Sequence, residues 1–516
     1  FDVALALREI FEKPTVRELT AGIESARRSG AGPEAPPIGA ASRDEALPLS
    51  FAQQGLWFLD QWEPNNSFYN LPAAIRLKGS LNINALENTL SEIVRRHEVL
   101  RTRIVTENGK PVQVIEQPGE LKLDLVDLGG LPRDLRDEET LRLANEEANR
   151  PFQLSEGPLL RIRLIRLSNE EHVVLLTLHH IVSDAWSIGV LIDEVGVLYS
   201  AYVEGRESPL PDLQIQYADY AAWQREWLQG AALEEHLKYW KKHLAGSPPM
   251  LNLPLDRPRP ARQSFKGTRQ SFMLSRALTD ELKAFSRREE VTLFMTLLAA
   301  FNTLLYRHTG EVDMVVGTAI AGRNRIETEG LIGFFVNILP MRTDLSANPR
   351  FKDLLKQVRE AALGAYDHQD LPYEKMVEEL QPDRQMDHKP IFQIAFGLQN
   401  APREVLEIPG LSLSSIRLEH EVVRFDLTLW ASEAAEGLQT HWTYSTDLFD
   451  DGTISQMYKR FEKLLRGIIA EPDARLNALD IIPEDERREQ ATQATARQEI
   501  GYKKFLTAKP KLIRVE

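Results

Sequence analysis

Two adjacent histidines, His179 and His180, end an apolar run of the chain, and Asp184 follows them. An imidazole changes its charge near neutral pH, so it can exchange a proton with a reacting amine, hydroxyl or thiol. The apolar run over residues 172–178 is short and rich in β-branched side chains, which predicts a buried strand. The residues from Ile188 onward have the pattern of an amphipathic helix. We therefore expect the histidines on a strand-to-helix turn, where α/β proteins expose reactive side chains.

Two interpretations of these residues are open at this point. In the first, an imidazole acts on a substrate, and Asp184 braces the turn or pairs with a distant arginine. In the second, the two histidines are a pair in the hydrophobic core and the aspartate only caps a helix. The spacing alone does not decide between them.

The composition narrows the function classes. The 516 residues are 43% hydrophobic and 27% charged, which is ordinary for a soluble globular protein. This length predicts about two to four compact units. The net charge of −14 disfavours nucleic-acid binding, which requires a basic face. The absence of cysteine excludes disulfides, thiolate catalysis and cysteine metal ligands, and it fits a cytoplasmic protein.

Membrane, metal and targeting signals are not evident in the sequence. No apolar run reaches the roughly 18 residues that a membrane span needs, so we expect no membrane span. The spacing of the 11 histidines does not indicate a metal site. The chain starts at Phe1 in the middle of a helical pattern and without a signal peptide, so we expect a piece of a longer protein.

The pattern along the chain predicts a mixed α/β fold between two less regular ends. Two short helices are expected over 1–11 and 15–23, and a linker rich in Pro, Gly and Ala follows, which we expect to be extended and mobile. A Pro-rich loop is expected over residues 244–260. Other predicted elements are the helices 84–96, 293–306 and 351–368 and the strands 160–167 and 314–317.

The histidine segment, His179-His180-Ile181-Val182-Ser183-Asp184-Ala185, resembles the HHxxxDG motif of nonribosomal peptide synthetase condensation domains. Ala185 stands where that family usually has glycine, and Gly55 replaces the customary arginine of its first motif. Further segments resemble the other motifs of the family in the expected order: residues 49–59, 96–102, 217–224, 332–337, 368–374 and 390–393. The first helices resemble the last third of a peptidyl carrier domain, whose phosphopantetheine-bearing serine lies upstream of this region.

The resemblance implies a fold similar to chloramphenicol acetyltransferase, with two α/β lobes in a V and a central tunnel. The histidine turn is then expected midway along the tunnel. The expected domains are a carrier remnant (1–27), a linker (28–45), the N-terminal lobe (46–228), the C-terminal lobe (229–487) and a linker or the start of the next module (488–516).

The resemblance also implies a reaction in which an aminoacyl amine on a downstream carrier attacks an acyl or peptidyl thioester on an upstream carrier. His180 and His179 are then the catalytic residues, with Asp184 as structural support. The substrates arrive on 4′-phosphopantetheine arms, and no cofactor is expected in the chain itself. We expect a cytoplasmic protein that is monomeric within a larger synthetase, with carrier domains as partners and without nucleic acid.

The residues after the first motif, Asp60-Gln61 and Asn65-Asn66, look like those of the class that joins an L-donor to an L-acceptor. Two alternatives stay open: a non-catalytic platform that recruits a tailoring enzyme, and an ester-forming acyltransferase of the same fold.

Other residues receive roles by position in the motifs. Arg323 and Arg101 are expected as ion-pair partners, with Arg323 reaching Asp184 from the second lobe. The aromatic residues of the fourth motif are expected to pack at the lobe junction, and His97 and His368 are expected to be structural. The residues expected to line the substrate channel are Ala185, Trp186, Ser187, Gly333 and Asn337.

Overall fold

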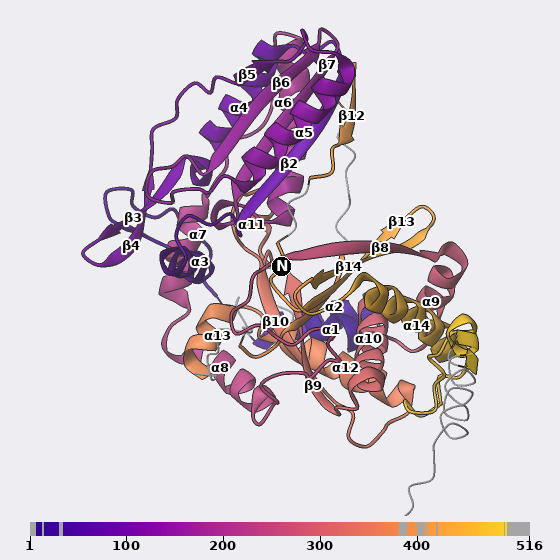
Figure 1. Ribbon diagram of the computed structural model, residues 1–516. Coiled ribbons are helices and arrows are strands. Elements are labelled where there is room, and N and C mark those ends of the chain that lie inside the picture. Colours follow the sequence, from indigo (N-terminus) through magenta and orange to yellow (C-terminus); the bar gives the residue numbers. More distant parts are fainter. Residues whose placement is uncertain are drawn as a thin grey trace, which may run out of the picture.

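The computed structural model describes residues 7–12, 15–29, 35–380, 390–399, 408, 410–418, 422–489 and 491–492. The chain forms two α/β parts, which Figure 1 shows one above the other. Each part is a twisted sheet with helices packed on it. This confirms the predicted mixed α/β fold with two lobes.

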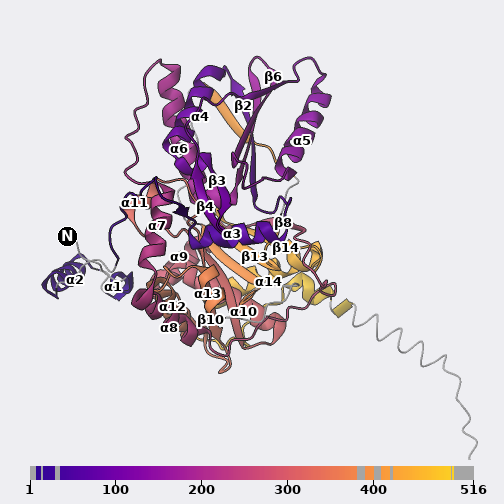
Figure 2. The same cartoon turned by 90° about the vertical axis from the view of Figure 1, so that its left-hand side faces the viewer.

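The sheet of the upper part runs in the order β12 (Leu411–Ser415), β2 (Asn70–Gly79), β7 (Glu171–His179), β6 (Leu160–Ser168) and β5 (Asp124–Asp127). Helices α4 (Ile83–Arg96) and α6 (Ala185–Val203) cover one face, and α5 (Arg133–Asn149) covers the other (Figure 2). Side chains of β7 alternate between these faces: Val173 and Leu175 pack in the cluster under α5, whereas Val174 packs in the cluster under α4. Strand β7 is thus buried on both faces, as its continuous apolar sequence predicts.

The sheet of the lower part runs in the order β10 (Asn337–Asp344), β9 (Asp313–Ile320), β11 (Ile394–Gln399), β13 (Leu427–Ala434), β14 (Gly437–Ser445) and β8 (Gly267–Ser275). Its core joins this sheet to the apolar faces of four helices, with Phe301, Trp442 and Phe461 fully buried in mutual ring contact. These helices are α9 (Arg276–Arg288), α10 (Leu293–Thr309), α12 (Phe351–Asp367) and α14 (Asp451–Ala470).

Shorter elements connect the two parts, and Figure 2 shows α3 (Phe51–Trp62) between them. Helix α3 begins with a capping box in which Ser50 and Gln53 satisfy each other's backbone amides. The strands β1 (Leu47–Pro48), β4 (Lys110–Ile115) and β3 (Thr102–Glu107) form a small third sheet. The remaining elements are α1 (Leu7–Glu12), α2 (Val16–Ser29), η1 (Glu98–Arg101), η2 (His180–Val182), α7 (Tyr217–Trp227), α8 (Gly230–Leu244), α11 (Ile326–Glu329) and α13 (Tyr373–Leu380).

Within the described residues the predicted strands and helices are present, and most differ only slightly at their ends. Residues 1–6 of the first predicted helix lie outside the described residues, and the second helix runs on to Ser29. One boundary matters: α6 begins at Ala185 rather than Ile188, because the Asp184 side chain caps it. The linker differs more. Ser29 belongs to α2, and the described linker residues are irregular but held in place, with Ala35 and Ile38 buried. The prediction of a mobile linker is therefore wrong for this stretch.

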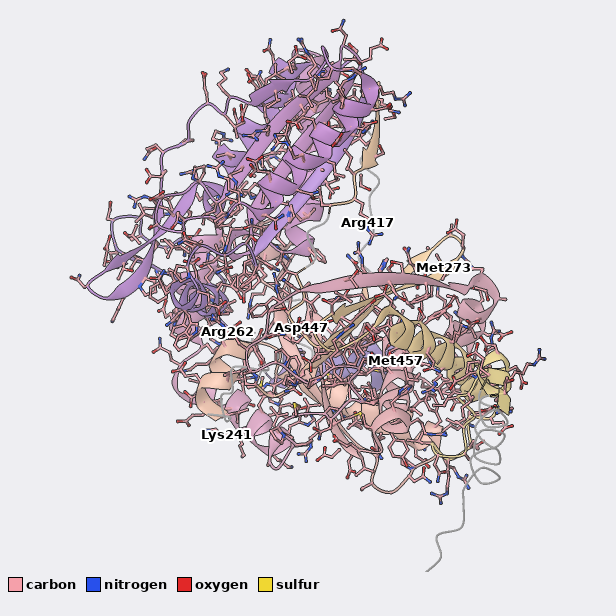
Figure 3. The ribbon with its side chains drawn as sticks, in the orientation of Figure 1. Lys241, Arg262, Met273, Arg417, Asp447 and Met457 are labelled. Carbon is pink, nitrogen blue, oxygen red and sulfur yellow. The ribbon has the colours of Figure 1, made fainter. Side chains whose placement is uncertain are left out.

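The chain crosses between the two parts twice after residue 229. Residues 321–336 leave β9, and Leu331, Ile332 and Phe335 enter the core of the upper part. Strand β12 then pairs with β2 along the edge of the upper sheet. Figure 3 shows Arg417, just after β12, on the stretch between the two parts. The upper part is therefore built from both halves of the sequence, and the lobe limits at 228 and 229 remain predictions.

In the described residues, one helix, α6, is long and apolar enough to cross a membrane, with a hydropathy of 1.2. This is weak evidence, since a core helix of a soluble protein passes the same test. Helix α6 packs on the upper sheet, and its Glu194 is buried in an ion pair with Arg96.

Helix α1 lies against the lower part, whereas α2 stands away from it (Figure 2). Arg8 of α1 donates to Glu360 of α12 at 2.8 Å and lies 3.7 Å from Asp367. These contacts fix where the chain enters. The assignment of residues 1–27 to a carrier domain remains a prediction, and residues 493–516 of the predicted tail lie outside the described residues.

A glycine allows the second crossing. Gly79 has a φ of 128°, and an added Cβ would lie 2.0 Å from the carbonyl oxygen of Gly410, which precedes β12. We expect Gly79→Ala to destabilise the protein by more than Gly109→Ala, a matched control with a φ of 77° and open space around it. The control carries only the backbone strain of about 1–2 kcal/mol. Urea unfolding of both variants measures the difference, and equal losses would show that the contact with Gly410 does not matter.

Candidate active site at the histidine turn

The turn that carries the histidines is held by backbone hydrogen bonds to the residues just before the two neighbouring strands, β6 and β2. The backbone amide of His179 donates to Leu159 O at 3.0 Å, and that of His180 donates to Tyr69 O at 2.7 Å. The turn continues as the 3₁₀ helix η2 and then enters α6. The histidines thus lie at the end of a buried strand with little freedom to move.

His180 presents one ring nitrogen for chemistry. Its Nδ1 lies 2.8 Å from Ser183 O, and since a carbonyl only accepts, Nδ1 carries the proton and Nε2 carries a lone pair. Within the part of the chain that the structure describes, Nε2 has no hydrogen-bond partner. The ring meets Phe334 edge-on, with centroids 4.8 Å apart. Burial, reinforced by the charge of Arg424, lowers the pKa of His180 to about 3. The imidazole is therefore neutral at physiological pH.

His179 faces the interior instead. It is 5% exposed and packs against the rings of Phe152 and Tyr69. Its Nδ1 accepts the amide proton of Ile181 at 3.1 Å. Burial, followed by the charges of Arg424 and Arg161, lowers the pKa of His179 to about 3. This placement gives His179 a supporting contact in the turn and no access to a substrate, so the expected pair of catalytic histidines reduces to His180.

Asp184 is the centre of a buried polar network. Its Oδ1 accepts from Ser187 N and Ser187 Oγ, both at 2.8 Å, and from Arg323 Nη2 at 3.3 Å, while Oδ2 accepts from Phe335 N at 2.9 Å. The side chains of Asp184 and Arg323 are 3% and 0% exposed. The predicted pairing of these two residues is confirmed.

Arg101, in contrast, donates to Glu116 O and lies 3.8 Å from Glu98, far from this network.

Three residues expected along the substrate channel have structural contacts. Ser187 is fully buried; its Oγ accepts from Gly333 N and lies 2.8 Å from both Gly333 O and Asp184 Oδ1, which share its one proton. A Cβ on Gly333 would lie 2.0 Å from the Tyr217 ring, so this glycine makes room for a side chain and not for a ligand. Asn337 donates to Gln369 O and Leu371 O and accepts from Tyr373 N and Ile338 N. For the buried Ser187 and Gly333, the expected role in the channel is wrong because their polar groups or free space are already used. Asn337 is half-buried and lines an open pocket beside α3 and α7, so its role in the channel stays a prediction.

The other two expected channel residues are at the start of α6. Ala185 is exposed and has an ordinary helical backbone, not a positive φ, so alanine costs no strain in place of the glycine usual in the resembling motif. Trp186 is 36% exposed and donates from Nε1 to Glu329 O at 2.9 Å. Whether their exposed faces meet a substrate stays a prediction.

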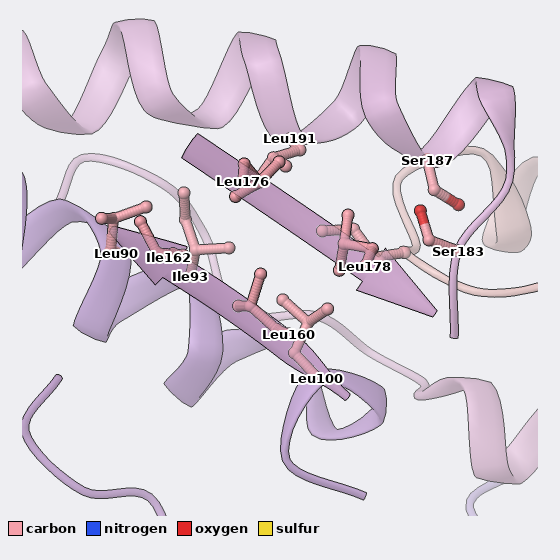
Figure 4. Close-up of a pocket in the computed structure, with 11 residues that line it drawn as sticks. Leu90, Ile93, Leu100, Leu160, Ile162, Leu176, Leu178, Ser183, Ser187 and Leu191 are labelled. Carbon is pink, nitrogen blue, oxygen red and sulfur yellow. The ribbon is translucent and has the colours of Figure 1, made fainter. Parts of the chain in front are cut away.

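Two pockets flank the site without including His180. An apolar cavity lies between α4, α6 and the upper sheet, lined by leucines and isoleucines with Ser183 and Ser187 at one end (Figure 4). An open pocket lies on the far side of Phe334, among α3, α7 and the loops at residues 322–337 and 369–372. Phe334 thus separates His180 from the open pocket.

The remaining motif residues are structural, as predicted. Tyr217 bonds Ser50 Oγ and donates to Phe334 O, and Tyr220 and Trp223 stack beside it. His97 bonds Glu194 and accepts from Ile332 N, and His368 bonds His236. In the described residues no group of three or more histidines and carboxylates that can hold a metal ion is present.

The sequence pattern missed two residues at the site, Tyr69 and Arg424. Tyr69 holds the turn through its carbonyl, and Phe334 packs on His180. Phe334 lies inside one of the family motifs, so the motif itself was a signal for it. No local signal marks Arg424, because it reaches the turn from the other half of the chain.

A model of the Condensation domain family matches residues 43–491. The chain belongs to the condensation-domain family. This condensation domain is 47% identical over 491 residues to a protein of the linear gramicidin synthase of Brevibacillus parabrevis, and the match covers 95% of this chain and 10% of that protein. It is 41% identical over 447 residues to phosphinothricin tripeptide synthetase PhsC of Streptomyces viridochromogenes, covering 86% of this chain and 41% of that protein.

Solved structures share the fold. The X-domain from teicoplanin biosynthesis superposes with a TM-score of 0.79 at 29% identity, over 87% of this chain and 100% of that one. The four-domain nonribosomal peptide synthetase holo-AB3403 gives a TM-score of 0.76 at 25% identity, over 85% of this chain and 34% of that one. The expected two-lobed, chloramphenicol acetyltransferase-like fold is confirmed.

The Asp184–Arg323 pair gives the first prediction for the site. We expect Asp184→Ala to lower the free energy of unfolding by about 3–5 kcal/mol, because it leaves the buried guanidinium of Arg323 without its carboxylate. The double variant Asp184→Ala/Arg323→Met removes both charges and should recover part of this loss. Denaturant unfolding of the three proteins gives the comparison. A single variant as stable as the parent would show that the pair does not hold the turn.

The low pKa of His180 predicts a pH dependence of stability. Unfolded, this histidine has a pKa near its ordinary 6.5, and folded it has a pKa of about 3. The unfolded chain therefore binds one more proton between these values, so the contribution of His180 to stability falls as the pH falls below 6.5. We compare the slope of the free energy of unfolding against pH in the parent and in His180→Gln. We expect this slope to be smaller in His180→Gln, by about 1.4 kcal/mol per pH unit. Urea unfolding between pH 5 and 6 measures both slopes, and parallel slopes would mean that His180 titrates normally in the folded protein.

Proposed function

We propose that this condensation domain forms an amide bond, by attack of a carrier-bound aminoacyl amine on an upstream carrier-bound acyl or peptidyl thioester. One observation carries the proposal: a neutral imidazole on a rigid turn keeps the Nε2 lone pair of His180 unpaired. Such a nitrogen can accept a hydrogen bond from the attacking amine and orient it. Orientation of two reactants is worth up to about 7–11 kcal/mol in ideal cases.

The sequence and the relatives support the finer parts of the proposal. The residues after the first motif favour an L-donor and an L-acceptor. Relatives are synthetases of which this chain spans 10% in one case and 41% in another, so we propose carrier domains as its partners. The substrates then arrive on 4′-phosphopantetheine arms, the domain binds no cofactor of its own, and the synthetase works in the cytoplasm.

A second candidate function has one observation in its favour. The X-domain from teicoplanin biosynthesis has this fold, and the same domain forms a complex with OxyB. If this chain worked in the same way, it would be a non-catalytic platform that binds a tailoring enzyme. The unpaired Nε2 of His180 and the intact buried network beneath it favour the enzyme over the platform.

Replacement of His180 tests the proposal. We expect His180→Ala to lower amide formation by about 10²–10⁴-fold, the usual contribution of a positioned acid–base group, without unfolding the protein. Donor and acceptor carriers are loaded, mixed with the domain, and followed by intact-protein mass spectrometry. His441→Ala, on β14 of the lower sheet, is the matched control.

Two outcomes would contradict the proposal. Parental turnover in His180→Ala would remove this residue from the mechanism. An inactive parent that nevertheless binds a tailoring enzyme would support the platform. A hydroxyl acceptor in the same assay tests ester formation, and product from that acceptor alone would assign the ester-forming activity.

A further inference from the structure

Arg424 lies beside the histidine turn, although it belongs to the segment that leads into β13 of the lower sheet. Its guanidinium lies 4.8 Å from the centroid of the Tyr69 ring, and its Nη2 lies 3.4 Å from Phe68 O. The carbonyl of that same Tyr69 accepts the backbone amide of His180 at 2.7 Å. Arg424 and His180 are therefore anchored to one residue from opposite parts of the molecule.

The charge of Arg424 has no counter-charge in the described structure. Other buried or partly buried arginines face carboxylates: Arg96 pairs with Glu194, Arg161 with Glu147 and Arg323 with Asp184. Among the described residues, Arg424 makes only the one long hydrogen bond to Phe68 O and has no carboxylate within ion-pair distance. Withdrawal from water lowers the pKa of Arg424, and Tyr69 opposes this shift. Arg424 is partly buried, and an unpaired cation that is partly withdrawn from water is costly to a fold, so its presence next to a reactive group points to a negatively charged ligand.

The position of this charge fits the reaction. Arg424 is close enough to lower the pKa of both histidines of the turn. A planar guanidinium has several N–H donors, and most of those of Arg424 are unused in the described structure. A group that binds between Arg424 and the Nε2 of His180 would thus meet a donor array on one side and a lone pair on the other.

We propose that Arg424 binds the carbonyl oxygen of the donor thioester and stabilises the oxyanion that forms on it. This inference rests on the proposed function. The amine nitrogen of the acceptor forms a bond to the thioester carbon, and the π electrons of the carbonyl move to its oxygen, which faces Arg424. The amine proton passes to Nε2 of His180. The oxyanion then collapses, the carbon–sulfur bond breaks, and the departing thiolate receives the proton from His180.

The oxyanion couples the charge of Arg424 to the basicity of His180. Without substrate, the positive charge of Arg424 disfavours a second positive charge on His180. The oxyanion cancels that effect, so His180 becomes a better proton acceptor when the tetrahedral intermediate forms. The guanidinium thus acts both on the oxygen that it touches and on the base opposite it.

Arg424→Met is the decisive variant, because it keeps a long apolar side chain over Tyr69 and removes the donors. We expect its single-turnover rate of amide formation to fall by about 10²–10³-fold, with carrier binding unchanged, as for loss of one oxyanion donor elsewhere. Arg424→Lys keeps the positive charge but lacks the planar array of N–H donors, and it should recover part of the rate. Arg288→Met, which removes a guanidinium 5.2 Å from the Phe285 ring on α9, is the matched control and should react like the parent.

Two donor substrates test whether Arg424 binds the oxyanion of the reaction or the phosphate of the phosphopantetheine arm. One is the carrier-bound thioester, and the other is the same acyl group on N-acetylcysteamine, which has no phosphate. Equal losses with both donors support the oxyanion. A loss confined to the carrier-bound donor overturns it and assigns Arg424 to the phosphate of the phosphopantetheine arm. Parental rates with both donors overturn any role in the reaction.

A binding measurement separates this inference from the proposed function. A phosphonate analogue of the tetrahedral intermediate is titrated into the parent and Arg424→Met by calorimetry, and we expect about 10²-fold weaker binding in the variant. Arg424-dependent binding in a parent that makes no amide would overturn the proposed function and leave the anion site. Equal binding by both proteins would overturn the anion site. If Arg424→Met does not fold, Arg424→Gln takes its place in every arm.

Discussion

The buried ion pair between Asp184 and Arg323 is the interaction on which the site depends. Placing two charges in a protein interior costs several kcal/mol for each ion, and one Coulombic contact alone rarely offsets this. Here both oxygens of Asp184 accept further bonds, from Ser187 and from Phe335 N, and Arg323 also donates to Leu331 O and Ser187 Oγ. The charges are tolerable because nearly all of their polar atoms have partners; of the two side chains, Arg323 Nε is the buried atom without one in the described structure.

That one pair links three elements that the chain keeps far apart. Asp184 begins α6 and so fixes where the turn ends, while Arg323 belongs to the stretch that crosses from the lower to the upper part. The bond from Phe335 N places the preceding Phe334 against the ring of His180. Tyr217 holds the same stretch from α7 by donating to Phe334 O. Helix capping, the crossing and the orientation of the imidazole are therefore one cooperative arrangement.

The sequence was informative where local pattern and chemistry agree. The apolar run, the turn and the helix that carry His180 could be predicted from spacing, and the Arg323–Asp184 pair from the need of a buried carboxylate for a cation. The structural contacts of Ser187, Gly333 and Asn337 could not. An amide or hydroxyl has the same donors and acceptors whether it meets a ligand or a backbone, and a glycine makes room for either. Their partners, such as Tyr217 and Leu371 O, are distant in sequence, so only the fold assigns them.

The environment of His180 decides how it can act. A ring whose pKa is about 3 is a weak base, so it does not carry a proton at rest and gains little by taking one from a free amine. It can still accept a hydrogen bond and orient the lone pair of the amine, which is already a good nucleophile when neutral. The proton has to leave only after the new bond has made that nitrogen positive, and negative charge on the former carbonyl oxygen then favours an imidazolium nearby. In the proposed reaction, such a site would supply orientation before the bond forms and basicity after it. A single neutral histidine in a low-dielectric turn is therefore suited to both.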